Sequence, residues 1–459
     1  MEQHHEKRLA FSRRDFMKTS ALAAGGLVVS ASALQAGVHI DGDDVIRVGL
    51  IGCGGRGTGA AMQALSVKQN TRLVAMADAF RDRIDNCYKH LTDPNSTDWS
   101  GAAVSDAKDH VQVPEEHKFV GFDAYAKVIP LCDVVILATP PGFRPEHFEA
   151  AVKAGKHVFM EKPVATDAPG VRRVLAAAEE AKKKKLNVVV GLQRHYQIVY
   201  REWVDRLHNG AIGSIHTSHV YWNGDGVWVN EREKLEKDAK RKLTEMEYQM
   251  RNWYYFNWLC GDHIVEQHIH NLDVSNWVKQ AYPVRANGSG GRQTRVGKDF
   301  GEIYDHHFVE FEYADGSRMF SQCRHIKGGM NRVSEAFQGS GGFAPRPGVI
   351  QTGTGYTLWE HRGKNDPNPY QVEHDELFEA ISKGDYKFAD AENGAKATMT
   401  AILGRMATYS GLVVEWDEAI NSSVNLLPSR MAWDADMPVK PGKDGMYAAA
   451  IPGTTQVLR

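Results

Sequence analysis

The sequence predicts an α/β protein in which an N-terminal domain built on a parallel sheet precedes a C-terminal α+β domain with a mostly antiparallel, open sheet. Three observations predict this class. Short apolar runs alternate with helical segments up to about residue 192, a glycine-rich turn at 52–57 follows the first run directly, and after Arg194 apolar residues alternate with polar ones. Strands alternating with helices form parallel sheets covered on both faces. The length of 459 residues also exceeds that of one ordinary core.

The first domain is expected over 45–192. Its predicted strands are 45–51, 73–77, 134–138, 157–160 and 187–190, each a short apolar run bounded by turn residues. Its predicted helices are 60–66, 145–154 and 171–185. This order of elements predicts a doubly wound sheet.

The second domain is expected over 193–412, followed by an extension over 413–459. A strand is predicted over 212–222, a hairpin over 305–320 that turns at Ala314-Asp315-Gly316, and a closing helix over 391–410. The densely charged segment 231–251 is interpreted as a solvated helix, with a lid over the site as the alternative. The Gly- and Pro-rich segment 339–368 predicts a long loop.

The N-terminus carries a predicted export signal. Ser12-Arg13-Arg14-Asp15-Phe16-Met17-Lys18 precedes an apolar, small-residue stretch over 21–36. This pattern is typical of a twin-arginine signal peptide over 1–36, and the alternative is an ordinary disordered N-terminus. It predicts a periplasmic protein that meets a membrane only during export and crosses it already folded.

Charge and cysteine content exclude several classes. The formal net charge of −2 provides no basic face, so nucleic-acid binding is not expected. The five cysteines are scattered and form no CxxC pair, which argues against a disulfide framework and predicts small buried side chains.

The glycine-rich turn predicts a dinucleotide site in a Rossmann domain. Gly52, Gly54 and Gly57 fit G-x-G-x-x-G, with Gly55 and Arg56 in the same turn. Asp78 follows 21 positions after Gly57, at a predicted strand end, where a carboxylate accepts ribose hydroxyls and repels a 2′-phosphate. NAD is therefore expected in preference to NADP. Thr139 and Pro140 are expected to line the nicotinamide side of the crevice.

Glu161-Lys162-Pro163 ends a predicted strand at the same sheet edge. Alone, this tripeptide is typical of a surface turn. Beside a nucleotide, however, Lys162 can hydrogen-bond a substrate hydroxyl and exchange protons with it.

On these motifs the chain resembles the Gfo/Idh/MocA (glucose–fructose oxidoreductase/inositol dehydrogenase) family. The matching stretches are Val48-Gly49-Leu50-Ile51-Gly52-Cys53-Gly54, Glu161-Lys162-Pro163, and Asn271-Leu272-Asp273 after His270. The resemblance implies oxidation or reduction of a sugar or polyol hydroxyl, and a sheet that often packs against a partner subunit in a homodimer or homotetramer. It also implies catalytic roles for Lys162, Glu266 and His270, although the family pattern has Asp where this chain has Glu266.

The segment 261–273 is unusually polar, and three interpretations stay open. On one continuous helix, His263, Glu266, His270 and Asp273 share a face, so that Glu266 would orient the His270 imidazole as a base. The set His263, Glu266 and His270 can instead hold a divalent metal. The third interpretation is a helix of structural buried histidines.

Further residues are expected to contact a carbohydrate substrate. They are Arg194, His195, Trp222, His263 and Tyr304, with Tyr221, Trp228 and Trp253 as further aromatic faces for sugar rings. The leading hypothesis is an exported oxidoreductase that holds NAD tightly. The alternatives are an NAD-dependent glycosidase that oxidises its sugar transiently and a non-catalytic periplasmic sugar-binding protein.

Overall fold

The computed structural model describes residues 45–93, 95–96 and 107–459. The expected signal peptide over 1–36 lies outside these residues. Within the described part of the chain, no helix combines the length and the apolar character that a membrane span requires.

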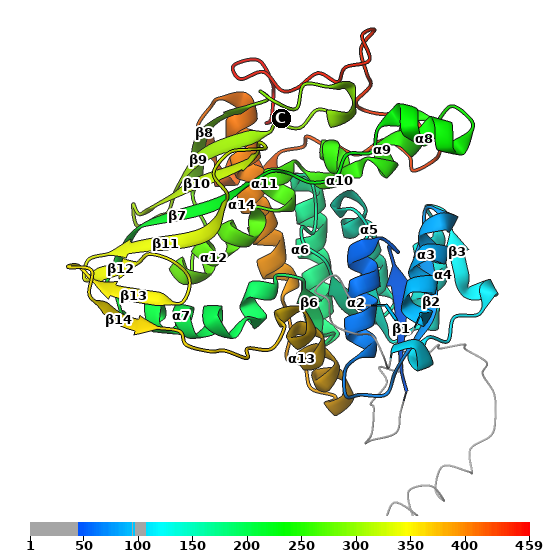
Figure 1. Cartoon of the computed structure of the whole chain (residues 1–459), viewed down its shortest axis with the longest axis horizontal. Helices are drawn as coiled ribbons and strands as arrows, with labels where there is room; N and C mark the ends of the chain where they lie inside the picture. Colours follow the sequence, from blue (N-terminus) through cyan, green and yellow to red (C-terminus); the bar gives the residue numbers. More distant parts are fainter. Residues whose placement is uncertain (1–44, 94, 97–106) are drawn as a thin grey trace, which may run out of the picture. The chain divides into compact units, whose positions relative to one another are not determined.

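The first domain contains a six-stranded parallel sheet in the order β3-β2-β1-β4-β5-β6 (Figure 1). This is the strand order of a Rossmann domain, and it confirms the predicted class. Its strands are β1 (Ile46–Ile51), β2 (Thr71–Asp78), β3 (Lys118–Val120), β4 (Val134–Leu137), β5 (His157–Met160) and β6 (Val188–Val190). The short strand β3 was not predicted.

Helices and short 3₁₀ turns connect these strands. The helices are α2 (Gly55–Leu65), α3 (Arg81–Thr92), α4 (Ala124–Val128), α5 (Arg144–Lys153) and α6 (Ala168–Lys183). The 3₁₀ turns are η1 (Ala107–His110), η2 (Glu115–His117), η3 (Ile129–Leu131), η4 (Pro141–Phe143) and η5 (Gln193–Tyr196). Because every crossover returns the chain to the same end of the sheet, the residues that follow the strands gather at one edge.

The second domain contains a nine-stranded sheet in the order β14-β13-β12-β11-β7-β10-β9-β8-β15 (Figure 1). Only the β7–β10 pair is parallel, so the prediction of a mostly antiparallel sheet is confirmed. Its strands are β7 (Ile215–Gly224), β8 (Arg285–Gly291), β9 (His306–Glu312), β10 (Arg318–His325), β11 (Arg332–Gly339), β12 (Gly342–Ala344), β13 (Val349–Thr352), β14 (Thr357–Glu360) and β15 (Val414–Glu415).

The helical elements of this half, in chain order, are α7 (Ile198–His208), α8 (Arg232–Ala239), α9 (Glu245–Arg251), η6 (Trp253–Tyr255), α10 (Asn257–Cys260), α11 (His263–Glu266), α12 (Ile269–Lys279), η7 (Lys298–Phe300), α13 (Pro369–Lys383), α14 (Ala391–Ser410) and α15 (Trp416–Asn421). Several of them pack on the first domain: α13 contacts α2, and both α14 and α15 contact α6. The extension also returns to the first domain, where the Ser422 carbonyl accepts a hydrogen bond from Arg172 of α6 at 2.9 Å.

Helix α14 lies between the two sheets and is buried along most of its length. A Cβ at Gly394 would come within 2.9 Å of Val190 in β6, and one at Gly404 within 2.8 Å of Phe311 in β9. Glycines therefore let this helix approach both domains closely. One apolar cluster continues through it, from Val135 of β4 to Val309 of β9.

Two predictions for the second domain are wrong. The segment 339–368 contains the short strands β12, β13 and β14, whose Gly-rich connections resemble a loop in the sequence. The charged segment 231–251 forms two helices, because Lys240 adopts a left-handed conformation after α8 and Thr244 caps the start of α9. The predicted hairpin is confirmed by the antiparallel pairing of β9 with β10, and the closing helix by α14.

The five cysteines are free and buried, as predicted.

Candidate active site

A cavity of about 640 Å³ lies at the carboxyl edge of the parallel sheet. Residues that follow the parallel strands line it: Gly52 after β1, Asp78 at the end of β2, Thr139 after β4, Glu161 after β5 and Gly191 after β6. The second domain supplies the opposite wall with Trp222, Trp228, Trp253, Glu266 and His270. The cavity therefore lies between the sheet edge at which Rossmann domains bind nucleotides and a wall of aromatic and ionisable side chains.

The glycine turn has space for a side chain where it faces the cavity, at Gly54, and none where it faces the sheet, at Gly57. A Cβ at Gly57 would come within 1.8 Å of the Gly52 carbonyl oxygen, so only glycine lets α2 approach β1 this closely. A Cβ at Gly54 would meet nothing within 4 Å. No side chain of the described residues caps the start of α2. Open space at a helix N-terminus fits the pyrophosphate of a dinucleotide.

Asp78 is held at the end of β2 by backbone donors. Its carboxylate accepts hydrogen bonds from the Cys53 N–H at 2.8 Å and from the Phe80 N–H at 3.0 Å. Burial raises the pKa of Asp78, and these two N–H groups oppose the shift. Arg83 lines the same end of the cavity, whereas Arg81 pairs with Asp85 and Glu115 on the surface.

Lys162 reaches across the cavity to the second domain. Its Nζ donates hydrogen bonds to the Glu266 carbonyl at 2.5 Å and to Glu266 Oε1 at 3.2 Å. Burial raises the pKa of Glu266, and the charge of Lys162 opposes this. The ion pair therefore fixes the lysine of the E-K-P motif against α11.

His270 faces the same space from α12. Its ring stacks on Trp222, with 5.9 Å between the centroids and an angle of 24°. Burial lowers the pKa of His270 well below its ordinary value, and the neighbouring Lys162 adds to the shift. The imidazole is therefore neutral near pH 7.

Several buried polar atoms around the cavity find no hydrogen-bond partner among the described residues. Five of them belong to lining residues: Arg56 Nη1, Arg144 Nε, Gln193 Oε1, Glu266 Oε2 and His270 Nδ1. Unpaired buried polar atoms are costly, and five of them gather in the wall of this one cavity.

The structure brings most of the predicted site residues to this cavity. Those that line it are Gly52, Gly54, Gly55, Arg56, Asp78, Thr139, Pro140, Glu161, Lys162, Trp222, Glu266 and His270. Gly57 lies behind the turn, as its packing role requires. Trp228 and Trp253 also line the cavity, whereas Tyr221 packs against Arg332.

The expectation of one continuous helix over the polar segment is wrong. Helix α11 ends at Glu266 and α12 begins at Ile269, so the helical phase is lost between them. His263 points toward Asp262 and His307, and Asp273 pairs with His195. Glu266 is bonded to Lys162 and does not orient His270. The metal set His263, Glu266 and His270 is therefore not assembled.

Four predicted substrate residues do not line the cavity. Arg194 pairs with buried Glu335, and His195 Nε2 lies 2.6 Å from Asp273 Oδ2. Tyr304 donates a hydrogen bond to the Ala450 carbonyl at 2.9 Å. Together with His263, these residues are committed to partners elsewhere, and their expected placement in the cleft is wrong.

Sequence reasoning missed several lining residues. Gln193 stands beside the chosen Arg194, but in the tight turn η5 neighbouring side chains point in different directions. Arg144 follows the Pro-Pro-Gly turn and is buried, which lowers its pKa to about 10. Tyr370 comes from the unpredicted helix α13. Its neighbour Arg56 lies 5.0 Å from the ring centroid.

The buried histidines predict acid sensitivity. Burial lowers the pKa of His147 and of His268 to about 3, and that of His270 and His374 well below its ordinary value. These rings are neutral in the folded state and take up protons when unfolded. Their contribution to stability is therefore complete above about pH 6.5 and falls below it, by about 1.4 kcal/mol per pH unit for each ring.

Urea denaturation at pH 7.5, 6.5 and 5.5, at constant ionic strength, measures this effect. We expect a small change in the free energy of unfolding between the first two values and a steep loss between the last two. Equal stability at pH 6.5 and 5.5 would contradict the assignment of neutral rings.

Comparison with known proteins agrees with this geometry. Residues 46–191 match the family model described as "Oxidoreductase family, NAD-binding Rossmann fold" (Gfo/Idh/MocA). The chain is 27% identical over 384 residues to an inositol 2-dehydrogenase of Serratia proteamaculans, covering 80% of this chain and 96% of that protein.

Two solved structures share the fold. An aldose-aldose oxidoreductase from Caulobacter crescentus, complexed with glycerol, superposes with a TM-score of 0.61 at 18% identity and covers 81% of this chain and 100% of its own. A scyllo-inositol dehydrogenase from Lactobacillus casei with bound NAD(H) and scyllo-inositol superposes with a TM-score of 0.58 at 17% sequence identity. The match covers 82% of this chain and 100% of that chain. With the glycine turn, Asp78 and Lys162 all at one sheet edge, residues 46–191 form an NAD-binding Rossmann domain of the Gfo/Idh/MocA oxidoreductase family.

Proposed function

We propose that this protein is an NAD-dependent oxidoreductase that acts on a hydroxyl group of a sugar or polyol. The observation that carries the proposal is the single cavity that runs from the glycine turn to Lys162, His270 and Trp222. The names of the relatives, inositol 2-dehydrogenase and aldose-aldose oxidoreductase, support the same substrate class.

The residues at the sheet edge fit NAD. Gly54 and the start of α2 would receive the pyrophosphate, and Asp78 would accept the ribose hydroxyls. Thr139, Pro140 and Glu161 would flank the nicotinamide end. When bound, NAD supplies a hydride acceptor for the carbon that carries the substrate hydroxyl.

The proton of that hydroxyl goes to this chain's own residues. Neutral His270 lines the cavity and is the proton acceptor. Lys162, held by Glu266, donates a hydrogen bond to the hydroxyl oxygen and holds it in place. Loss of the proton then makes departure of the hydride from the same carbon favourable.

Aromatic residues on the second domain exclude water and provide a flat surface. Trp222 stacks on His270, and the rings of Trp228 and Trp253 lie 6.0 Å apart in an edge contact. The C–H faces of a sugar or polyol ring pack well on such side chains. The end of α9 closes this side, where Arg251 bonds Asp82 of α3 at 3.0 Å.

Export is part of the proposal and rests on the twin-arginine motif at Arg13 and Arg14. A periplasmic enzyme has no exchangeable pool of NAD, so tight retention of the cofactor and a second sugar or other acceptor that regenerates it are expected. Assembly as a homodimer or homotetramer through the second sheet is proposed on the family resemblance.

Native mass spectrometry of the purified protein, followed by a substrate screen, tests the proposal. We expect one NAD per chain and reduction of that NAD, seen at 340 nm, with a subset of aldoses, inositols and alkyl glycosides. Release of an aglycone without net reduction would replace the proposal with the glycosidase alternative. Protein that neither carries nor binds NAD would favour the sugar-binding alternative.

A further inference from the structure

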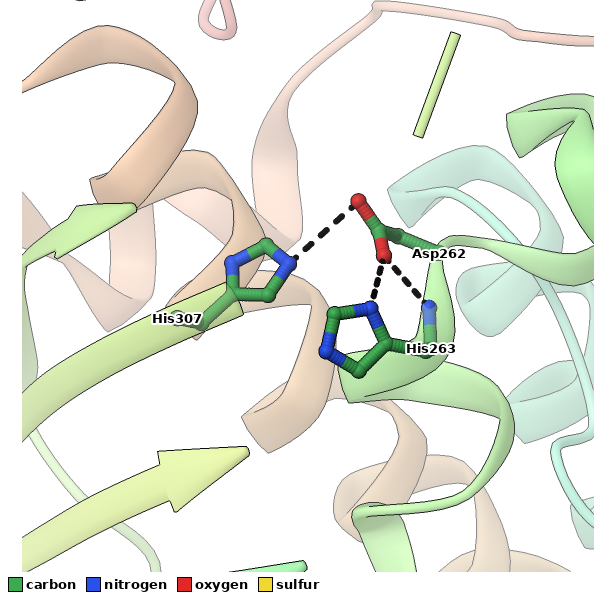
Figure 2. Close-up of side chains that lie close together, drawn as sticks. All are labelled: Asp262, His263 and His307. Carbon is green, nitrogen blue, oxygen red and sulfur yellow. Dashed lines mark hydrogen bonds and ion pairs between the residues drawn. The ribbon is translucent and has the colours of Figure 1, made fainter. Parts of the chain in front are cut away.

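A second cluster of titratable side chains lies outside the cavity. Asp262 and His263 stand at the start of α11, and His307 lies in β9 (Figure 2). The three side chains are completely buried. His263 Nδ1 is 2.8 Å from Asp262 Oδ1, and His307 Nε2 is 3.3 Å from Asp262 Oδ2. One ligand atom from each residue lies within 4.8 Å of the other two.

One tautomer of His307 aims a lone pair at the carboxylate. Its Nδ1 lies 2.9 Å from Thr408 Oγ1, and that hydroxyl also reaches the Arg405 carbonyl of its own helix at 3.0 Å. A hydroxyl has a single proton. When that proton goes to the carbonyl, Nδ1 donates to Oγ1, and Nε2 faces Asp262 as an acceptor. In this tautomer, a cation between Nε2 and the carboxylate satisfies both acceptors.

His263 presents a second ring to the same carboxylate. Its Nδ1 lies 2.8 Å from Asp262 Oδ1, and its Nε2 makes no hydrogen bond with the described residues. One face of the ring stacks on His325 at 4.6 Å, while His325 Nε2 bonds Gln267 Oε1 at 2.7 Å. The imidazole is therefore held in position with one nitrogen at the carboxylate.

The donor types also suit a metal. A carboxylate oxygen and imidazole nitrogens are the donors that divalent first-row metals prefer.

The surrounding residues support metal ligation. Asp262 Oδ2 accepts hydrogen bonds from the Tyr304 N–H at 2.9 Å and from the Tyr409 hydroxyl at 2.5 Å. Thr408 fixes the ring of His307 from its far nitrogen. Metal ligands are commonly oriented by such contacts to their second polar atom.

We propose that Asp262, His263 and His307 bind a divalent transition-metal ion, with zinc as the expected metal. The site is structural, because none of the three residues lines the catalytic cavity. The ion ties β9 to the start of α11, and Glu266 at the end of the same short helix holds Lys162. The metal would thus stabilise the wall that carries the catalytic residues.

Elemental analysis of full-length protein, purified without a polyhistidine tag, tests the site. We expect about one zinc per chain after dialysis against metal-free buffer, and a lower Tm after treatment with a strong chelator. The variant His307→Gln should lose the metal. The matched control is His268→Gln, because His268 is equally buried nearby but bonds Ser321 Oγ at 2.8 Å.

The wild-type protein decides the question even where a variant fails to fold. No first-row metal after growth in zinc-supplemented medium, with a Tm that neither chelator nor added zinc changes, would overturn the proposal. Full metal content in folded His307→Gln would overturn it too. Uptake of Co²⁺ with visible d–d bands, lost in His307→Gln and kept in His268→Gln, would support it. These readouts are metal content and stability, so they are independent of the proposed redox activity.

Discussion

Replacing Lys162 with Met should lower kcat by roughly 10³-fold while NAD stays bound, because the side chain that holds the reacting hydroxyl is lost and the nucleotide contacts remain. Glu266, whose pKa burial already raises, can take up a proton when its partner is removed, so the fold should survive. Steady-state rates on the best substrate, with native mass spectrometry for bound NAD, measure both effects.

Two variants refine this test. Lys162→Arg keeps a positive charge but is permanently protonated. It therefore shows whether the lysine acts through its charge alone or also by exchanging a proton with the substrate. Lys153→Met, an exposed lysine at the end of α5, is the matched control and should leave kcat unchanged. Simultaneous loss of NAD and activity in Lys162→Met would show that the lysine is structural. Unchanged turnover would remove it from the mechanism.

Gly57→Ala should destabilise the protein by roughly 3 kcal/mol or more, since overpacking against backbone cannot be relieved by a rotamer change. The new Cβ would lie 1.8 Å from the Gly52 carbonyl oxygen, so α2 would have to move away from β1. Thermal and urea denaturation of the purified variant measure the loss.

Gly54→Ala, three residues away in the same turn, provides the contrast. Its φ of −75° suits any residue, and its Cβ would meet nothing within 4 Å, so stability should be unchanged within about 0.5 kcal/mol. The methyl group would project where the pyrophosphate is expected, so the affinity for NAD should fall. Equal stability losses in both variants would contradict this account of the turn.

Local patterns were sufficient for five of the six strands of the first domain. Buried parallel strands are continuous apolar runs, and the G-x-G-x-x-G turn, Asp78 and Glu161-Lys162-Pro163 each follow such a run. Since parallel strands end at one edge, the cavity that joins Gly54, Asp78 and Lys162 could be predicted without coordinates.

Parts of the second domain could not be predicted from the sequence. The helical wheel over 261–273 assumed an unbroken helix, and the break after Glu266 removed His263 from the face that carries His270. Contacts between distant segments, such as Asp262 with His307, leave no local pattern. The edge strands β12 to β14 are too short and rich in glycine for alternation to be visible.

The position of α14 near the end of the chain has a consequence for biosynthesis. During translation, residues 391–410 leave the ribosome after every strand of the two sheets except β15, yet this helix fills the space between α6 and strands β8 and β9. Neither half can therefore complete its packing while the chain is still growing, and final collapse must wait until synthesis is nearly finished. A secretion route that accepts only finished molecules suits such a chain better than one that threads it through a pore during translation.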